Sequence, residues 1–362
     1  MIAYAPEAWQ EYAGITPGTR VDRLVSCLEL APTTLALAGA PIPETMQGRP
    51  FLGGALDPEP EYVYATRDRM DERCDTIRMV RDKRYKYIRN YQPFQPYSQY
   101  LSYNEQSPVQ QDLNRLREEG ALPPGAHWMS ATRKPVEELY DTEQDPHEIN
   151  NIAALPESSP ILERMREALE ARMEAIGDLG LLPESELDRL GKQYGCRYYI
   201  RKRHEAAHPG FWRRLHETAA LAGQPQSADE PALLQALDSE HPAIRWWAVT
   251  GLAQLSASET TMSALRRAMQ DDAAVVAVAA ARALLQQEDA NDDALAILVN
   301  GLNVQDEWIR IQAANALDAV GEKARPVVDT LEQAIEEPDN KYVARLACHA
   351  VNALLGTNYE AP

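Results

Sequence analysis

The sequence predicts an α+β region followed by an all-α solenoid, and three patterns along its 362 residues support this fold class. Within residues 62–88, short stretches alternate polar and apolar side chains with period two, as half-buried strands do. Residues 160–176 carry apolar side chains at helical spacing, and after Asp229 a helical pattern recurs every 32 or 33 residues. We therefore expect a small antiparallel sheet with a helix, and then stacked helix pairs.

The composition is that of a globular protein long enough for two or three domains, with 44% hydrophobic and 25% charged residues. Its net charge of −19 argues against nucleic acid and against an anionic membrane surface as partners. No apolar run is long enough to cross a bilayer, and no charged and apolar leader follows Met1. The chain as written carries no export signal, which predicts a cytoplasmic protein.

The first segment begins with a strand-like stretch at residues 2–5. A helical pattern follows over residues 22–37, with a break expected at Pro32 and an end at Gly39. The four cysteines stand far apart in the sequence. A zinc site or a dense disulfide framework would bring cysteines closer together along the chain. We expect all four to be free thiols: Cys27, Cys74, Cys196 and Cys348.

Three strands are expected at residues 62–66, 76–80 and 85–88. Residues 67–89 hold nine Arg or Lys against five Asp or Glu, a local surplus of positive charge in an acidic chain. One interpretation is that these side chains are solvated. The other is that Arg67 and Arg69, in an irregular loop, bind the sulfate or carboxylate oxygens of an anionic sugar, because a guanidinium fork fits such groups.

A strand at residues 136–140 is expected to end in a cluster of turn and cap formers, Asp141, Asp145, Pro146 and Asn150. The helix at 160–176 then follows. His147 lies in this turn without a second His or Cys at ligand spacing, so we expect it to stabilise the turn and not to bind a metal.

This strand, turn and helix resemble those near the C-terminal end of the sulfatase family, especially the bacterial relatives of heparan N-sulfatase; the residues that carry the resemblance are Glu138-Leu139-Tyr140-Asp141, Pro146-His147-Glu148 and Asn150-Asn151-Ile152-Ala153. Residues 21–33 and 46–49 resemble the sulfatase segment after the last strands of the catalytic sheet. Cys27 and Glu29 depart from it, because the family usually has an aromatic residue and an Asp there. The resemblance implies sulfated carbohydrate as the substrate of the full-length family, whose members are usually periplasmic, extracellular or lysosomal.

The resemblance also implies which parts are absent. Sulfatases convert a cysteine in a Cys-x-Pro-Ser-Arg pattern to formylglycine, and hold a calcium ion with Asp and Asn residues. None of the four cysteines here has that pattern, and the paired Asp ligands and the later Asp-Asn-Gly segment are missing. We therefore assign no catalytic residue, no metal ligand and no cofactor to this chain, and expect it to be inactive as a sulfatase by itself.

A connector with interleaved basic and aromatic residues is expected before the repeats. Such a pattern can bind single-stranded nucleic acid by stacking. The cluster is short and the chain is acidic, so we favour a linker that docks on the acidic region after it. The residues concerned are Arg197, Tyr198, Tyr199, Arg201, Lys202, Arg203, Trp212, Arg213 and Arg214.

Residues from Asp229 to the end of the sequence resemble short HEAT-like repeats of the PBS-lyase type. The expected helix ends are Leu237, Met269, Leu302 and Ile335, and Arg245 and Arg310 stand where such repeats often keep an Arg. Helix pairs of this kind stack because one pair cannot bury its apolar face alone. This region has 9 basic and 21 acidic residues and is a candidate surface for a protein partner.

The predicted organisation is the end of a sulfatase catalytic domain at 1–55, a sulfatase C-terminal subdomain at 56–185, the connector at 186–228, and HEAT-like repeats at 229–357. The predicted function is the C-terminal portion of a hydrolase of sulfate esters or sulfamates on sugars, with a HEAT-like interaction module. The alternative is a non-catalytic HEAT-like scaffold that carries a sulfatase remnant.

Overall fold

The structure, a computed structural model, describes residues 2–54, 56–287, 291–336 and 340–361. It contains two compact units. The first comprises residues 1–66, 78–89 and 137–172, and the second comprises residues 67–77, 90–136 and 173–362. These two units do not test the four domain boundaries expected from the sequence, which stay predictions.

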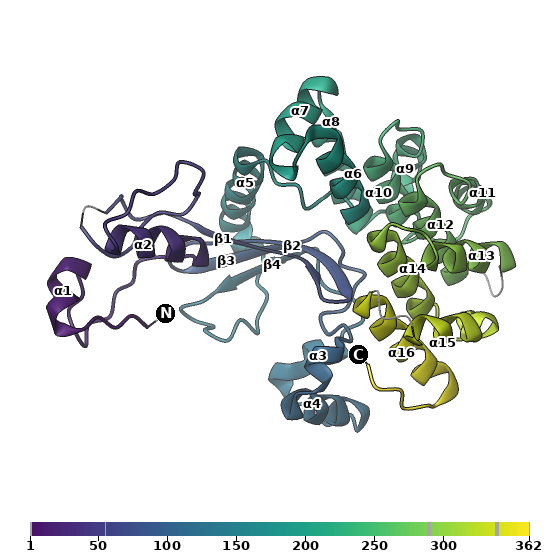
Figure 1. The fold of residues 1–362 in the computed structure, drawn as a ribbon, viewed down its shortest axis with the longest axis horizontal. Helices are drawn as coiled ribbons and strands as arrows, with labels where there is room; N and C mark the ends of the chain where they lie inside the picture. Colours follow the sequence, from purple (N-terminus) through teal and green to yellow (C-terminus); the bar gives the residue numbers. More distant parts are fainter. Residues whose placement is uncertain (1, 55, 288–290, 337–339, 362) are drawn as a thin grey trace. The chain divides into compact units, whose positions relative to one another are not determined.

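A four-stranded sheet contains β1 (Val63–Met70), β2 (Arg73–Arg81), β3 (Tyr85–Asn90) and β4 (Glu137–Asp141) in that spatial order (Figure 1). Strands β3 and β4 are antiparallel, with Tyr85 opposite Asp141. Two and three residues join β1 to β2 and β2 to β3, connections that only antiparallel neighbours allow. The small antiparallel sheet that the sequence predicts is therefore confirmed.

The expected loop at residues 67–72 is wrong, because strand β1 continues through Arg67 and Arg69 to Met70. Asp71 adopts a left-handed conformation with φ of 47°, which Asp tolerates better than most residues, and the hairpin turns there. Polar residues continue the strand because backbone pairing with β2 stabilises it, and such pairing cannot be read from local residue preferences.

The turn after β4 is held by the side chains of Asp145 and Asn151, of which the sequence marks Asp145 as a turn former. The Oδ2 atom of Asp145 accepts hydrogen bonds from the backbone N–H groups of Ile149 and Asn150, each at 2.7 Å. Asn151 accepts the Leu139 N–H at 2.9 Å and donates to the Glu137 carbonyl at 3.1 Å. The chain is thereby returned along β4 before helix α5 (Ser159–Ile176), which confirms the predicted strand, turn and helix.

The N-terminal segment contains α1 (Glu7–Ala13) and α2 (Leu30–Leu37). Residues 2–5 form no strand, so that expectation is wrong. Pro32 does not break the second helix, because it lies in the first turn, where its missing N–H has no helical partner to lose. Two further short helices, α3 (Ser102–Glu105) and α4 (Pro108–Glu118), lie between β3 and β4 in sequence.

The expected connector is helical and contains α6 (Glu184–Tyr194), α7 (Ile200–Ala207) and α8 (Phe211–Gly223). Two of its basic side chains form ion pairs with acidic residues that precede the repeats: Arg197 with Asp188, and Arg201 with Glu174 at 2.5 Å. Docking on the repeats is instead apolar. The face of α8 that carries Leu215 and Ala219 is fully buried.

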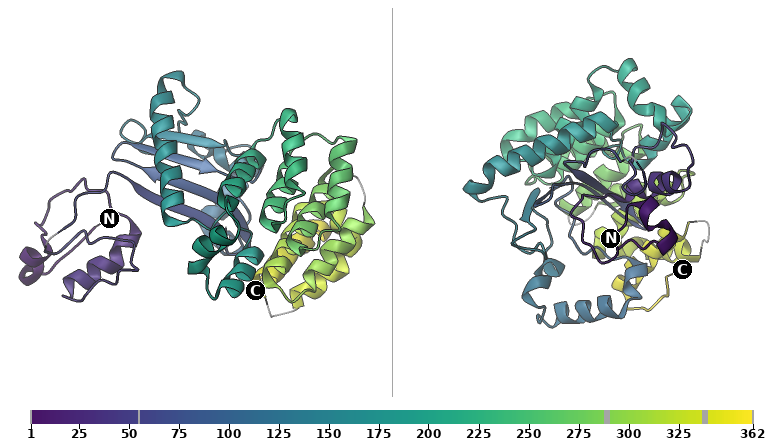
Figure 2. Two further views of the ribbon diagram at one scale, coloured as in Figure 1. Left: turned by 90° about the horizontal axis from the view of Figure 1, so that it is seen from above. Right: turned by 90° about the vertical axis from the view of Figure 1, so that its left-hand side faces the viewer.

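In the described part of the chain after α8, the helices form four successive pairs, and neighbouring pairs lie side by side (Figures 1 and 2). The pairs are α9 (Glu230–Ala236) with α10 (Pro242–Leu252), α11 (Glu259–Ala268) with α12 (Ala274–Gln287), α13 (Asp292–Leu302) with α14 (Glu307–Ala319), and α15 (Val328–Glu336) with α16 (Lys341–Leu355). The predicted all-α solenoid is confirmed.

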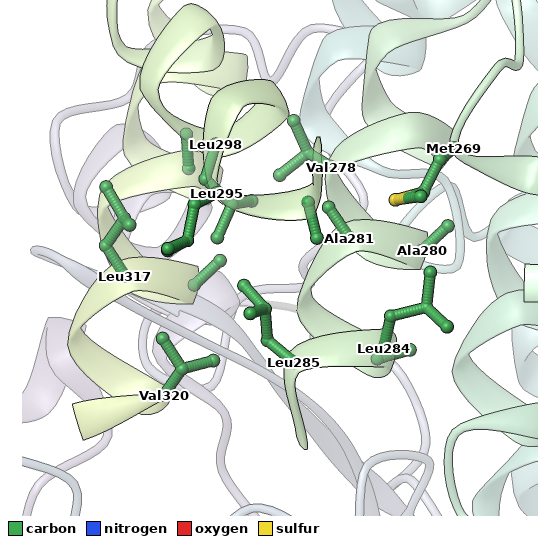
Figure 3. Close-up of a cluster of buried hydrophobic side chains, with 14 of the residues drawn as sticks. Met269, Val278, Ala280, Ala281, Leu284, Leu285, Leu295, Leu298, Leu317 and Val320 are labelled. Atoms are coloured by element: carbon green, nitrogen blue, oxygen red, sulfur yellow. The ribbon is translucent and has the colours of Figure 1, made fainter. Parts of the chain in front are cut away.

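One continuous apolar core runs through the repeats (Figure 3). Leu284 and Leu317, which recur at the repeat spacing, are both fully buried. Small residues allow close helix approach: a Cβ at Gly251 would lie 3.0 Å from the Ala222 Cα, so α8 and α10 meet nearly backbone to backbone. No helix within the described part of the chain is both long and apolar enough to cross a membrane.

We predict that Ala314→Leu lowers the stability of the full chain. Ala314 is 1% exposed, and added methylene groups in a packed core typically cost about 1–3 kcal/mol. Urea unfolding followed by circular dichroism measures the change. Asp272→Ser is the control, because that carboxylate is exposed and Arg245 keeps its buried partner Asp271, so a change within about 0.5 kcal/mol is expected. Equal effects of the two substitutions would contradict the prediction.

Candidate functional site

A cleft of about 750 Å³ lies within the second unit. One wall is formed by residues of β1 and β2, and another by the loop 180–183 and the start of α6. The third consists of α10, α12 and α14, the second helices of successive repeat pairs. Residues far apart in sequence therefore converge on one site.

Arg73 of β2 fixes the sheet end of the cleft to the repeats. Its guanidinium contacts Asp318 Oδ2 at 2.6 Å, Asn315 Oδ1 at 3.0 Å and the Tyr100 carbonyl at 2.9 Å. Asn315 in turn donates to the Glu72 carbonyl at 2.8 Å. Burial alone would raise the pKa of the Asp318 carboxyl, but the hydrogen bond with His349 and the charge of Arg73 lower it below its ordinary value.

A second buried ion pair, between Asp75 and Lys134, holds the next part of the β2 wall. Both side chains are almost completely inaccessible, at 1% and 0% exposed. Asp75 also accepts the backbone N–H of Thr76 at 2.8 Å. Buried charges of this kind require both partners, so loss of either side chain would destabilise this wall of the cleft.

Aromatic side chains line the opposite part of the cleft. Trp246 and Trp247 of α10 meet edge to face with ring centroids 4.8 Å apart. The Trp247 Nε1–H donates to the Leu181 carbonyl at 2.8 Å and so fixes the loop 180–183 on α10. Trp308 of α14 is covered by the guanidinium of Arg69, 4.9 Å from the ring centroid.

Among the described residues that line the cleft, four buried side-chain atoms have no hydrogen-bond partner: Arg282 Nε, Trp246 Nε1, Ser185 Oγ and Gln287 Oε1. Leaving such an atom unpaired costs roughly 1–3 kcal/mol. Two of the four can only donate, one can only accept, and the hydroxyl can do either. The cleft therefore presents an incomplete hydrogen-bonding set that a polar ligand would complete.

Arg282 gives this set a positive charge. Loss of water and the nearby positive charge of Arg73 lower the pKa of the Arg282 guanidinium. An anion in the cleft would relieve both unfavourable effects, since it would replace the lost water and screen the two like charges. Arg133, which donates to Gln254 Oε1 at 3.2 Å, lies on the same cleft and adds a further cation.

Of the two arginines that the sequence proposes as sugar contacts, Arg69 lines the cleft and Arg67 is not among its lining residues. Arg69 is already paired with Glu184 at 2.9 Å and donates to the Asp71 carbonyl at 2.6 Å. Burial opposes the charged form of Arg69, but Glu184 offsets it and the pKa is raised. Burial also raises the pKa of Glu184 despite its partner. A ligand would compete with Glu184 for Arg69, so the substrate role of Arg67 and Arg69 stays a prediction.

Cys74 also lines the cleft, but its chemistry is that of a structural thiol. Burial, and then the charge of Glu184, raise its pKa to about 12. A thiol nucleophile needs a lowered pKa, which positive neighbours normally provide. All four cysteines are free, as the sequence predicts.

The residues present do not fit the calcium and formylglycine that the sulfatase resemblance implies. No cysteine stands in the required pattern. Among the residues that the structure describes, one group of three metal-type ligands converges, His208, Glu240 and His241. Two imidazoles are unlike the oxygen-only sets that bind calcium, so no catalytic step is derived through either group.

The comparison with known proteins separates the chain into two kinds of sequence. Residues 213–285, 230–303 and 263–352 match the family of HEAT repeats. An ulvan-active sulfatase from Formosa agariphila is 44% identical over 169 residues, which cover 47% of this chain and 28% of that protein. Part of this chain is similar to sulfatases.

A second ulvan-active sulfatase of the same organism is 34% identical over 171 residues, covering 46% of this chain and 32% of the relative. The chain thus spans less than a third of the length of either curated relative. Among solved structures, a 2-O GAG sulfatase is 27% identical with a TM-score of 0.30, covering 44% of this chain and 27% of that one. The chain joins a part similar to sulfatases to HEAT repeats, as the sequence predicts.

The residues that sequence reasoning missed come from the repeats. Trp246, Arg282 and Gln287 lie on second helices, where the periodic pattern explains their neighbours as packing residues. The sequence signal that could have identified these cleft residues is a polar or aromatic side chain within an otherwise small and apolar helix. The shared face of α10, α12 and α14 would have placed them together.

We predict that Cys74 resists alkylation by iodoacetamide at pH 8 in the folded protein, while the exposed thiols of Cys27 and Cys196 react. A pKa of about 12 leaves almost no thiolate at that pH. Mass spectrometry after limited labelling measures the order of reaction. Labelling in urea, where all four thiols should react, is the control; equal rates for Cys74 and Cys27 in the folded chain would contradict the expectation.

We predict that Asp318→Asn destabilises the chain at pH 7 by on the order of 3 kcal/mol, because Arg73 then stays buried without its partner charge. The Asp318 pKa is lowered on folding, so its contribution is complete above the ordinary carboxyl pKa of about 4 and is lost as the pH falls below it. Urea unfolding at pH 7, 5, 4 and 3 should show the wild type and the variant converging at low pH. A difference that stays constant over this range would refute the assignment.

Proposed function

We propose that this chain is the C-terminal portion of a sulfatase-family hydrolase of sulfate esters or sulfamates on sugars, and that its cleft binds the sulfated sugar. The observation that carries the proposal is the set of unpaired buried atoms in the cleft, with the charge of Arg282 among them. A sulfated sugar supplies an anion for the guanidinium and hydroxyl groups for the remaining donors and acceptors.

The aromatic part of the cleft suits the sugar ring itself. Sugar rings present C–H faces that pack on flat aromatic side chains, while Trp N–H groups bond hydroxyl oxygens. Trp246 offers both a ring and an unpaired Nε1–H to the cleft. The amide side chains of Gln254 and Gln287 lie on the same side and add hydrogen-bonding capacity.

Similarity to two ulvan-active sulfatases supports a sulfated polysaccharide as the substrate class. The HEAT repeats contribute one wall of the cleft, so in this proposal their first role is to shape the binding site. Binding of a protein partner by the repeats stays an expectation from the sequence. Calcium and formylglycine belong to the proposed full-length enzyme, and this chain's own residues bind and orient the sugar.

We predict that the chain binds sulfated ulvan oligosaccharides and that Arg282→Gln weakens this binding by roughly tenfold or more, since a hydrogen bond to a charged group contributes about 1.5–3 kcal/mol. Gln keeps part of the side chain and removes the charge. Isothermal titration with sulfated and chemically desulfated oligosaccharides of equal length gives the two affinities. The loss on substitution should be confined to the sulfated ligand.

Arg267→Gln is the matched control, because Arg267 lies on a repeat helix, is 67% exposed and does not line the cleft. Trp246→Phe retains the ring and removes the unpaired N–H, so it should weaken binding of both ligands. Equal affinity for sulfated and desulfated sugars, or an Arg282→Gln variant that binds like the control, would exclude the cleft as a sulfated-sugar site.

A further inference from the structure

Three potential metal ligands converge where the helices before the repeats meet the first repeat. His208 caps the C-terminus of α7, and Glu240 and His241 lie in the turn between α9 and α10. The Glu240 Oε1 atom is 3.4 Å from His208 Nδ1 and 3.2 Å from His241 Nε2. All three ligand atoms lie within 4.8 Å of one another. None of these residues lines the cleft described above.

Two of the three separations, those from Glu240, match the spacing of ligand atoms in a tetrahedral metal site. Zinc binds imidazole nitrogen and carboxylate oxygen at about 2.0–2.2 Å, which places neighbouring ligand atoms roughly 3.3 Å apart in a tetrahedron. Both distances from Glu240 lie within 0.2 Å of that value. A hydrogen-bonded carboxylate and imidazole would normally be closer, at about 2.7–2.9 Å.

His241 is the observation that points to a ligand most directly. The residue is 6% exposed, and its Nε2 atom is buried without a hydrogen-bond partner. A buried imidazole nitrogen is normally paired, because leaving it unpaired costs free energy. A metal ion at Glu240 would supply the missing partner.

Aromatic side chains hold the two imidazoles in position. The Phe211 ring packs against His241 with centroids 4.6 Å apart, and the two ligand imidazoles are themselves 4.7 Å apart and nearly perpendicular. His204 packs against His208 at 4.6 Å and is fixed by a 3.0 Å hydrogen bond between its Nδ1 and the Tyr194 hydroxyl. Apolar packing around a metal centre restricts ring rotation and favours one coordination geometry.

The cluster combines two imidazoles with one carboxylate, so it offers a metal one anionic ligand. Arg214 and Arg189 add positive charge nearby, although Arg189 is paired with Glu186 at 2.7 Å. The Glu240 carboxylate is 71% exposed, so it neutralises part of a metal's charge from the solvent side.

We propose that His208, Glu240 and His241 form a binding site for a zinc ion, with a water molecule in the fourth position. Two imidazoles and one carboxylate form a set that zinc accepts, whereas calcium and magnesium prefer oxygen ligands alone. Because His208 follows α7 and the other two ligands precede α10, the ion joins the helices before the repeats to the first repeat. This inference is independent of the function proposed for the cleft.

The test uses the full chain after dialysis against EDTA and then metal-free buffer. Titration with zinc chloride, followed by calorimetry, should give one site per chain, and the melting temperature should rise with the logarithm of the free zinc concentration once this exceeds the dissociation constant. Cobalt chloride should give the visible absorption band of a tetrahedral site. Glu240→Gln and His208→Ala should each weaken zinc binding by more than about tenfold and remove the cobalt band.

Glu240→Gln keeps the size of a mostly exposed side chain, so the fold should stay intact. Any change in zinc binding then reports the loss of the carboxylate ligand. His147→Ala is the control, because it removes an exposed histidine that is not part of the cluster and should leave zinc binding unchanged. Absence of one-to-one binding in the wild type would overturn the proposal. Zinc binding that Glu240→Gln and His208→Ala leave unchanged, or that His147→Ala abolishes, would overturn it as well.

Discussion

The ion pair between Arg73 and Asp318 is the contact on which the candidate site depends. It joins residues 245 positions apart, one on strand β2 and one on helix α14, and both side chains are nearly buried. Further hydrogen bonds extend the pair: Arg73 also donates to the Tyr100 carbonyl and to Asn315 Oδ1, and Asp318 Oδ1 is bonded to His349 Nδ1. This arrangement fixes the end of the sheet against the repeats at one register, and the cleft is the space that remains beside it.

Close packing of the repeats sets the shape of the opposite wall. Alanines such as Ala280 and Ala313 are fully buried on the second helices, which brings neighbouring helices close together. Leu284 and Leu317 of the same helices fill the core beside these alanines. Trp246, Arg282 and Gln287 also lie on second helices, and all three line the cleft. The second helices thus contribute both to the core of the solenoid and to one wall of the cleft.

The cleft and the histidine cluster share a physical signature. In both, a buried polar atom lacks a partner: Arg282 Nε and Trp246 Nε1 in the cleft, His241 Nε2 in the cluster. Folded proteins rarely leave such atoms unpaired, because desolvation is not repaid without a hydrogen bond or a metal bond. The two sites differ in what would satisfy them. The cleft offers positive charge and donors to an anionic, hydroxyl-rich ligand, and the cluster offers two imidazoles and a carboxylate to a cation.

The sequence by itself determined the elements whose cause is local. The recurrence of Leu284 and Leu317 at the repeat spacing predicts helix pairs, and Asp145 and Asn150 predict the turn after β4, because periodicity and turn chemistry act over a few residues. Tertiary structure alone decided that Arg67 and Arg69 extend a strand, since strand pairing is non-local. It also decided which side chains meet. The partners of Arg73, the walls of the cleft and the approach of His208 to His241 depend on how successive helices stack, and no spacing along the chain encodes that convergence.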